Sequence, residues 1–305
     1  MKHLATALHA LAVLAFASAG DAQDPAAQGT EPPLQPKGEP KVEIQRLEAW
    51  PTLKGKALEA LRTDVERLRK ARTPEMAEQA QATLAATGAA AAPDLIAVLG
   101  KEQDPGALAR VESVLERVTG AEHTRLLAGE FAAKAGPVRT WCLKRAARFP
   151  DAGVRSPAEA ALDRVTKLGE KADREERYAA ALCATSAGSL RGVDVLASWA
   201  VEGWGKRGEE MRFALEAVRG PEASGIVFPL IASEERQKIV GGLHMLAGCG
   251  DPAAAERVRP FLDSDDNSIR VAAINAMRGI VDGEPPIANL PVFEAIELAK
   301  QWKSR

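Results

Sequence analysis

Apolar residues recur at helical spacing along most of the chain. From about residue 46 onward they lie three or four positions apart, which places them on one face of an α-helix. Examples are Leu58, Leu61, Val65 and Leu68, and further along Leu108, Val111, Val114, Leu115 and Val118. No stretch has the sustained alternation, or the β-branched and aromatic richness, of a β-strand. The pattern predicts an all-α fold.

Glycine and proline divide this helical pattern into blocks of similar length. The blocks begin every 30 to 35 residues, near Ala89, Ala121, Ser156, Ser189, Pro221 and Asp251. A helix–turn–helix unit of this length buries its two apolar faces only between neighbouring units. We therefore expect an α-solenoid of six stacked helical hairpins, a HEAT/armadillo-like superhelix, within residues 46–305. Capping helices are expected at 56–86 and 291–305, with Phe293, Leu298 and Trp302 facing inward.

The block from Gly250 to Gly283 is the most regular. Its first helix ends in Pro260-Phe261-Leu262, an acidic turn follows from Asp263 to Asp266, and the second helix opens with Ile269-Arg270. A stripe of small residues then leads to the closing glycine. These features resemble the HEAT-like repeats of the phycobilisome-lyase type of bacterial repeat protein. The resemblance covers roughly residues 75–283 and implies a repeat fold, while HEAT-like arrays serve many functions.

The N-terminal 45 residues differ in character from the rest. Residues 1–19 place Lys2 before an apolar run that ends in Ala17-Ser18-Ala19, the layout of a secretory signal peptide. Residues 20–45 carry five prolines and scattered charge, which is typical of a disordered tether. These segments predict an exported protein, periplasmic or secreted. No later segment is expected to cross a membrane.

Charge and cysteine content narrow the classes of partner. The chain has 40 basic and 42 acidic residues, so its net charge of -2 provides no general attraction for nucleic acid or an anionic membrane. The three cysteines, Cys142, Cys183 and Cys249, lie inside expected helices and are odd in number. We expect free thiols instead of a disulfide framework.

Short motifs give little support for chemistry. The sequence Gly203-Trp204-Gly205-Lys206-Arg207-Gly208 matches a dinucleotide fingerprint but lies between two helices, where no strand precedes it. Asp263, Asp265 and Asn267 open like a calcium loop, yet the glycine and glutamate that such a loop requires are missing. There, Asp266 or Asn267 is expected to cap the next helix. We predict no catalytic residue, no cofactor and no metal.

One basic segment has features that are typical of a binding site. The stretch from 134 to 149 has no acidic residue, and on a helix its Trp141 lies between several cations. The predicted partner-binding residues are Arg139, Trp141, Lys144, Arg145 and Arg148. Cations beside an aromatic ring bind bases, sugars or carboxylates. In the alternative interpretation Trp141 packs into the stack and the cations only cover it.

Basic residues also recur near the start of each second helix: Arg110, Arg139, Arg177, Arg212, Lys238 and Arg270. One interpretation makes them a ladder for an anionic partner. The other makes each one a structural link to an acidic turn, since acidic residues precede them closely. The leading hypothesis is a non-catalytic scaffold or adaptor that binds another protein. The resemblance implies an alternative, a lyase-like chaperone or enzyme, and an assembly factor of an envelope complex is a third.

Overall fold

The computed structural model describes residues 44–305, and these residues form helices without any β-strand. The predictions for residues 1–19 and 20–43 lie outside the described part. The helices are α1 (Lys56–Arg69), α2 (Pro74–Thr87), α3 (Ala92–Leu99), α4 (Pro105–Val118), α5 (Thr124–Ala128), α6 (Gly136–Ala147), α7 (Arg155–Leu168), α8 (Arg174–Ser186), α9 (Val193–Glu202), α10 (Gly208–Glu216), α11 (Pro221–Ile231), α12 (Arg236–Cys249), α13 (Ala254–Val258), α14 (Asn267–Met277) and α15 (Val292–Ser304).

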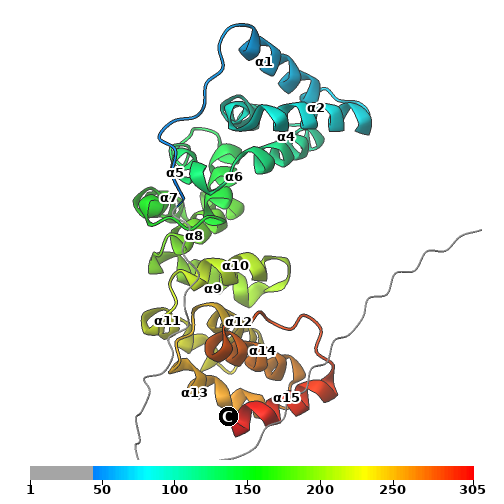
Figure 1. Ribbon diagram of the computed structural model, residues 1–305. Helices are drawn as coiled ribbons and strands as arrows, with labels where there is room; N and C mark the ends of the chain where they lie inside the picture. The colour runs from blue at the N-terminus through cyan, green and yellow to red at the C-terminus, as the bar shows by residue number, and fades with distance from the viewer. Residues whose placement is uncertain (1–43) are drawn as a thin grey trace, which may run out of the picture. The chain divides into compact units, whose positions relative to one another are not determined.

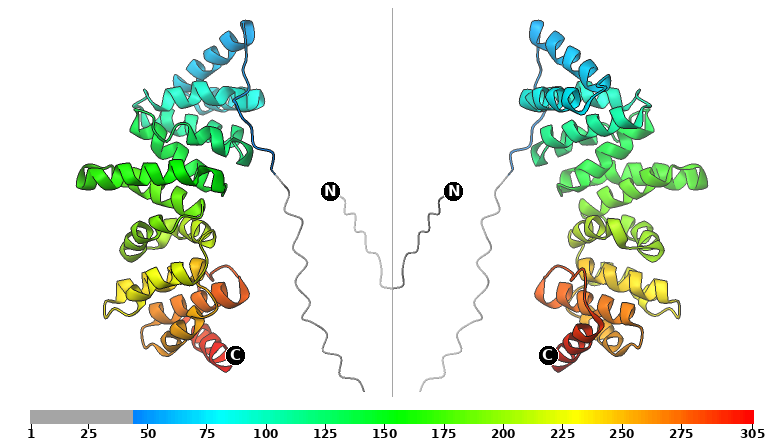
Figure 2. Two further views of the ribbon diagram at one scale, coloured as in Figure 1. Left: turned by 90° about the vertical axis from the view of Figure 1, so that its left-hand side faces the viewer. Right: turned by 90° about the vertical axis from the view of Figure 1, so that its right-hand side faces the viewer.

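These helices pair in chain order into stacked hairpins (Figures 1 and 2). Six hairpins run from α3/α4 to α13/α14, preceded by α1/α2 and followed by α15. Each even-numbered helix from α6 to α12 packs on the even-numbered helix of the next hairpin. Alanine, leucine and valine dominate the buried side chains, so the helices approach closely. The structure confirms the all-α, HEAT-like solenoid that the block pattern predicts.

The hairpins begin close to the expected positions. The fourth predicted block boundary, Ser189, is followed at once by the 3₁₀ turn Leu190–Gly192 and then by α9. The block expected near Ser156 begins earlier, in the 3₁₀ turn Ala152–Val154. Asp266 caps α14 by accepting hydrogen bonds from the backbone of Ser268 and Ile269 at 2.7 and 3.3 Å. Asp266 is thus the capping residue, and Asn267 is the first residue of the helix.

One expectation for the C-terminal cap is wrong. Trp302 is buried and Leu298 is half-buried against the core, but the Phe293 side chain is 85% exposed. Nine residues separate Phe293 from Trp302, and at 100° per residue this places the two on opposite faces of α15. The buried face instead takes its apolar residues from Ala295, Ala299 and Trp302.

An extended segment before α1 returns to the second hairpin (Figure 1). The Leu47 amide donates a hydrogen bond of 3.0 Å to the Glu122 carbonyl, and Arg46 forms an ion pair of 3.2 Å with Asp151. The Trp50 ring stacks on the buried His123 imidazole at a centroid distance of 5.3 Å. This segment is therefore part of the folded unit, although it contains no regular helix.

One stretch of the described chain, Pro74–Leu99, is long and apolar enough to cross a membrane by composition alone. The expectation that no such segment follows the N-terminus is wrong on that criterion. The stretch is not a single straight helix, because α2 ends at Gly88, where φ is 70°, and α3 starts after a 3₁₀ turn. Leu84 and Leu95 from its two halves are fully buried in the hairpin core.

The close approach of helices requires glycine at particular positions. A Cβ atom on Gly241 of α12 would lie 2.8 Å from the Ala200 carbonyl oxygen of α9. This contact is with backbone, so α9 would have to move. In contrast, Gly225 of α11 is exposed, and a Cβ atom there would meet nothing within 4 Å.

These two glycines give a paired prediction. Gly241→Ala is expected to destabilise the protein by about 1 to 3 kcal/mol because it overpacks a helix contact. Gly225→Ala is expected to stabilise it by about 0.5 to 1 kcal/mol because alanine loses less entropy in a helix. Urea unfolding followed by circular dichroism measures both. Equal effects of the two substitutions would contradict the close α9–α12 packing.

Candidate functional site

Three cavities lie along the second helices of the hairpins. The N-terminal cavity, about 580 Å³, is lined by residues of α4, α6 and α8 and by Glu210 of α10. The middle cavity, about 560 Å³, lies over α6, α8 and α10, and the C-terminal cavity, about 820 Å³, over α10, α12 and α14. Neighbouring cavities share side chains: Lys144, Arg145, Arg148 and Glu210 in one case, Glu209 and Arg212 in the other. Together they form one continuous surface, which we call the second-helix groove.

Equivalent positions line this groove at a constant spacing. Leu182, Phe213, His244 and Asn275 follow one another at intervals of 31 residues, on α8, α10, α12 and α14. All four contribute to the middle or C-terminal cavity. Phe213 is 39% exposed, so an aromatic side chain is available to a partner in the middle of the row.

All five residues predicted to bind a partner line the N-terminal cavity. The structure therefore brings Arg139, Trp141, Lys144, Arg145 and Arg148 together as the helical pattern indicates. However, the lining contains five basic and five acidic side chains, the latter from Glu112, Glu116, Asp173, Glu176 and Glu210. The cavity is a balanced field of charges instead of a basic patch. Binding at these residues stays a prediction.

Arg139 is held by a buried ion-pair cluster. Its guanidinium donates hydrogen bonds of 2.7 and 2.6 Å to the two carboxylate oxygens of Glu176, and two of 2.8 Å to the Ala133 and Lys134 carbonyls. Arg164 donates a further bond of 2.8 Å to Glu176, whose side chain is 4% exposed. Burial raises the pKa of Glu176, but the two guanidinium groups outweigh it, so the pKa is lower than usual. Arg139 thus connects α6 to α8.

The other four residues differ in how far they are committed to internal contacts. Trp141 is only 8% exposed and packs in the core. Arg145 donates hydrogen bonds to the Glu116 carbonyl at the end of α4 and to the Thr119 hydroxyl, the latter at 3.0 Å. Lys144 pairs with Glu175 at 3.0 Å, whereas Arg148 is exposed. Arg148 is the most accessible cation of the five.

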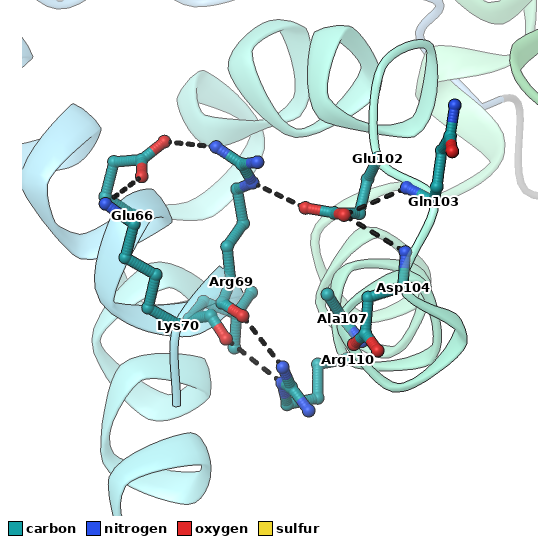
Figure 3. A network of polar contacts seen from close by, with 9 residues as sticks. Glu66, Arg69, Lys70, Glu102, Gln103, Asp104, Ala107 and Arg110 are labelled. Atoms are coloured by element: carbon teal, nitrogen blue, oxygen red, sulfur yellow. Dashed lines mark hydrogen bonds and ion pairs between the residues drawn. The ribbon is translucent and has the colours of Figure 1, made fainter. Parts of the chain in front are cut away.

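Most of the basic residues that recur near the start of the second helices form contacts within the protein. Arg110 illustrates this: it donates bonds of 3.0 and 2.9 Å to the carbonyls of Leu68 and Arg69 at the end of α1 (Figure 3). In the same network Arg69 bridges Glu66 and Glu102, at 2.6 and 2.8 Å. Arg270 binds the Ser264 carbonyl at 2.6 Å, and Arg177 binds that of Gly169. Lys238 and Arg212 pair with acidic residues on their own helices.

A cluster of cations and aromatic rings that the sequence pattern does not predict lies beside the groove. The Arg207 guanidinium lies 4.5 Å from the centre of the Tyr178 ring and 4.1 Å from that of Trp199. Arg174 covers Trp199 at 4.2 Å, and the Tyr178 hydroxyl donates a bond of 3.2 Å to Glu210. Tyr178 precedes Glu209, a groove residue, by 31 residues, so the repeat spacing could have predicted that Tyr178 lies near the groove. Trp199 and Arg207, which contact Tyr178, come from other elements, and the spacing does not predict their position.

His244 and Trp204 form a second unpredicted feature, in the C-terminal cavity. Their rings stack at a centroid distance of 5.1 Å. Burial lowers the pKa of His244 to about 4, so the imidazole is neutral at physiological pH. Among the described side chains, none forms a hydrogen bond with either ring nitrogen of His244. The fingerprint-like glycines at 203–208 form the turn between α9 and α10, with a 3₁₀ turn at Gly205–Arg207.

Within residues 44–305, no group of three His, Cys, Asp or Glu side chains gathers in a way that would hold a metal ion. Cys142, Cys183 and Cys249 are buried and free, as predicted. Burial raises the pKa of all three thiols, that of Cys249 to about 12. Buried thiols of high pKa are poor nucleophiles, so these cysteines serve packing.

Comparison with known proteins gives distant similarities. No family model matches the chain, and no curated protein matches it. Among solved structures, the complex of CpcE and CpcF of phycocyanin lyase from Nostoc sp. is 16% identical, covering 87% of this chain and 99% of that one, with a TM-score of 0.41. Two engineered proteins are 16% and 15% identical, covering 82% and 74% of this chain and 75% and 98% of their own, with TM-scores of 0.36 and 0.31. These similarities are too distant to support an argument. The repeat architecture is therefore established from the helices of this chain, and its function has to be inferred from its own residues.

The ion-pair cluster predicts a stability profile in acid. The pKa of Glu176 is lower in the folded state than in the unfolded chain, so its contribution is complete above about pH 4.5 and is lost as the pH falls through the folded value. Glu176→Gln is expected to cost about 3 kcal/mol at pH 7, because it leaves two guanidinium groups without their carboxylate. It should also flatten the fall in stability below about pH 4.5. Chemical unfolding at several pH values tests this, with the exposed Glu170→Gln as the control that should match the parent protein.

A second pair of variants separates internal links from accessible charge. Arg145→Ala is expected to destabilise the protein by about 1 to 3 kcal/mol, because the carbonyls at the end of α4 lose a charged donor. Arg148→Ala, at an exposed site, is expected to change stability by less than about 0.5 kcal/mol. Thermal unfolding measures both. A large effect of Arg148→Ala would show that its side chain also joins neighbouring hairpins.

Proposed function

We propose that this chain is a non-catalytic scaffold that binds another protein along the second-helix groove, and that it does so after export to the periplasm or the outside of the cell. The observation that carries the proposal is the continuity of the groove from α4 to α14. Three cavities that share their lining residues offer a surface for one extended segment of a partner. The residues 1–19 support export by their signal-like sequence.

The chemistry of the groove favours a polypeptide over a small anion. Its N-terminal third has equal numbers of basic and acidic side chains, and Arg139, Glu176 and Lys144 among them are already in ion pairs. Its C-terminal third has Val240, Val271, Ile287 and Leu290 among its lining residues. A polypeptide supplies mixed charge and apolar side chains in succession, whereas a nucleic acid would require uncompensated positive charge.

The alternative of a lyase-like chaperone or enzyme rests on the family resemblance. An enzyme needs a nucleophile or a general acid and base within hydrogen-bonding reach of each other. In the groove, Arg139 and Glu176 are instead joined as a carboxylate–guanidinium pair that connects helices, Lys144 pairs with Glu175, and Glu210 accepts a hydrogen bond from Tyr178. This supports binding in preference to catalysis.

Site-specific photocrosslinking tests the proposal. A photoreactive phenylalanine analogue at position 213, which is exposed in the groove, is expected to form an adduct with a defined protein in the cells that naturally produce the chain. The same analogue at position 293 provides a matched control, because Phe293 is exposed on α15 and does not line the groove. Mass spectrometry identifies the adducts. Adducts at position 293 and none at position 213 would exclude the groove as the binding surface.

A further inference from the structure

A segment of this chain already occupies part of the second-helix groove. Residues 284–290 follow the π-helical turn Arg278–Asp282 at the end of α14, have no regular secondary structure, and contact α14 through Ile287. The buried Asn275 carboxamide accepts a hydrogen bond of 2.8 Å from the Ile287 amide and donates one of 3.3 Å to the Ile287 carbonyl. Arg278 pairs with Glu284 at 2.7 Å. The second-helix groove therefore binds the backbone of a non-helical segment through the side chain of Asn275, while Arg278 pairs with the glutamate three residues before Ile287.

One repeat earlier, α12 has side chains at the positions equivalent to Asn275 and Val271, but within residues 44–305 no segment of the chain is bonded to them. His244 and Val240 on α12 stand 31 residues before Asn275 and Val271 on α14, and all four line the C-terminal cavity. One wall of this cavity of about 820 Å³ is the segment from Pro285 to Leu290 itself, and another includes Trp204. The C-terminal cavity thus lies between residues 285–290 and the α12 side chains Val240 and His244.

His244 can form one of the two kinds of bond that Asn275 forms there. A neutral imidazole has one N–H donor and one nitrogen acceptor that point in different directions, so it bonds the backbone of one residue through a single nitrogen. Trp204 holds the imidazole ring by stacking at 5.1 Å, which limits its orientations. Arg212, which pairs with Glu216 on α10, is the cation that lines the same cavity, and Glu209 lies in the lining beside it.

The bound segment also specifies the ligand. It begins Glu284-Pro285-Pro286-Ile287, and the chain contains one other Pro-Pro pair, in Glu31-Pro32-Pro33-Leu34. Both pairs stand between a glutamate and an aliphatic residue. Consecutive prolines favour the extended polyproline II conformation, so such a segment loses little entropy when it binds.

We propose that the C-terminal cavity binds an extended peptide segment of a partner protein in which Pro-Pro stands between a glutamate and an aliphatic residue, with His244 bonded to the backbone of the aliphatic residue. The proposal rests on the proposed function and names the chemistry of the partner segment. The aliphatic side chain packs on Val240 and Val271, and the glutamate faces Arg212.

A peptide titration tests this. The probe is a fluorescein-labelled peptide with the sequence of residues 29–37, GTEPPLQPK. The protein is the full chain with Pro32→Ala and Pro33→Ala, so that it adds no competing copy of the motif. Fluorescence anisotropy is expected to show saturable binding. A peptide with alanine at both proline positions is expected to bind at least tenfold more weakly, because it must lose more conformational freedom.

Variants of the protein locate the site. His244→Phe keeps a ring against Trp204 but removes both nitrogens, and is expected to weaken binding at least tenfold with an unchanged melting temperature. Ala288→Trp, at an exposed position of the cavity wall, gives a second test that does not alter the core. It is expected to block the cavity and abolish binding. Phe293→Ala should bind like the parent protein.

Two results would overturn the proposal: equal affinity for the proline and alanine peptides, or full binding by Ala288→Trp. Failure of the peptide together with crosslinking at position 213 would leave the proposed scaffold function intact and remove only this ligand. Failure of both would remove the groove as a binding surface.

Discussion

The guanidinium group at the carbonyl end of a helix is the interaction on which this stack depends. The last carbonyls of an α-helix have no partner within the helix and carry the negative end of its dipole. Arg110 covers the end of α1, Arg145 the end of α4, and Arg155 that of α8, through bonds to the Ala187 and Gly188 carbonyls. Arg219 reaches Gly250 and Gly279, each at 3.0 Å, and so joins the ends of two later hairpins. Arginine suits this position because its planar group directs several donors at once.

This use of arginine determines what remains for recognition. A guanidinium that neutralises a helix end, or a buried carboxylate such as Glu176, is not available to an external anion. The groove therefore has little net charge even where its sequence is rich in basic residues. What it does offer is the exposed Phe213 and the half-buried His244, which is stacked on Trp204, while the buried Asn275 already binds the Ile287 backbone. Recognition by shape and backbone hydrogen bonds suits a polypeptide better than recognition by charge.

The periodic part of this arrangement was accessible from the sequence. Helical spacing and the glycine and proline boundaries predicted the hairpins, and Asp266 was recognised as a possible cap. The helix predicted around Trp141 placed five residues close together, and all five line one cavity. The sequence did not show that Glu176, 37 residues after Arg139, returns to the same place, because such contacts depend on how hairpins stack. Phe293 was misplaced because the faces of a short terminal helix depend on the single surface against which it packs.

The row at 31-residue spacing also accounts for the different character of the two ends of the groove. From Leu182 to Asn275 the spacing is constant, so equivalent side chains continue from helix to helix and give a surface with repeated geometry. The equivalent residue on α6, counted from the helix start, is Lys144, which precedes Leu182 by 38 residues. The extra length lies in α7, which has 14 residues against 10 in α9, and in its connection to α8, which contains the 3₁₀ turn Gly169–Lys171. At this change of register the 31-residue row ends, and the ion pairs Arg139–Glu176 and Lys144–Glu175 connect α6 to α8. The cavity with five basic and five acidic side chains thus lies at the change in spacing, and the cavity with Val240, Val271, Ile287 and Leu290 lies where the spacing is constant.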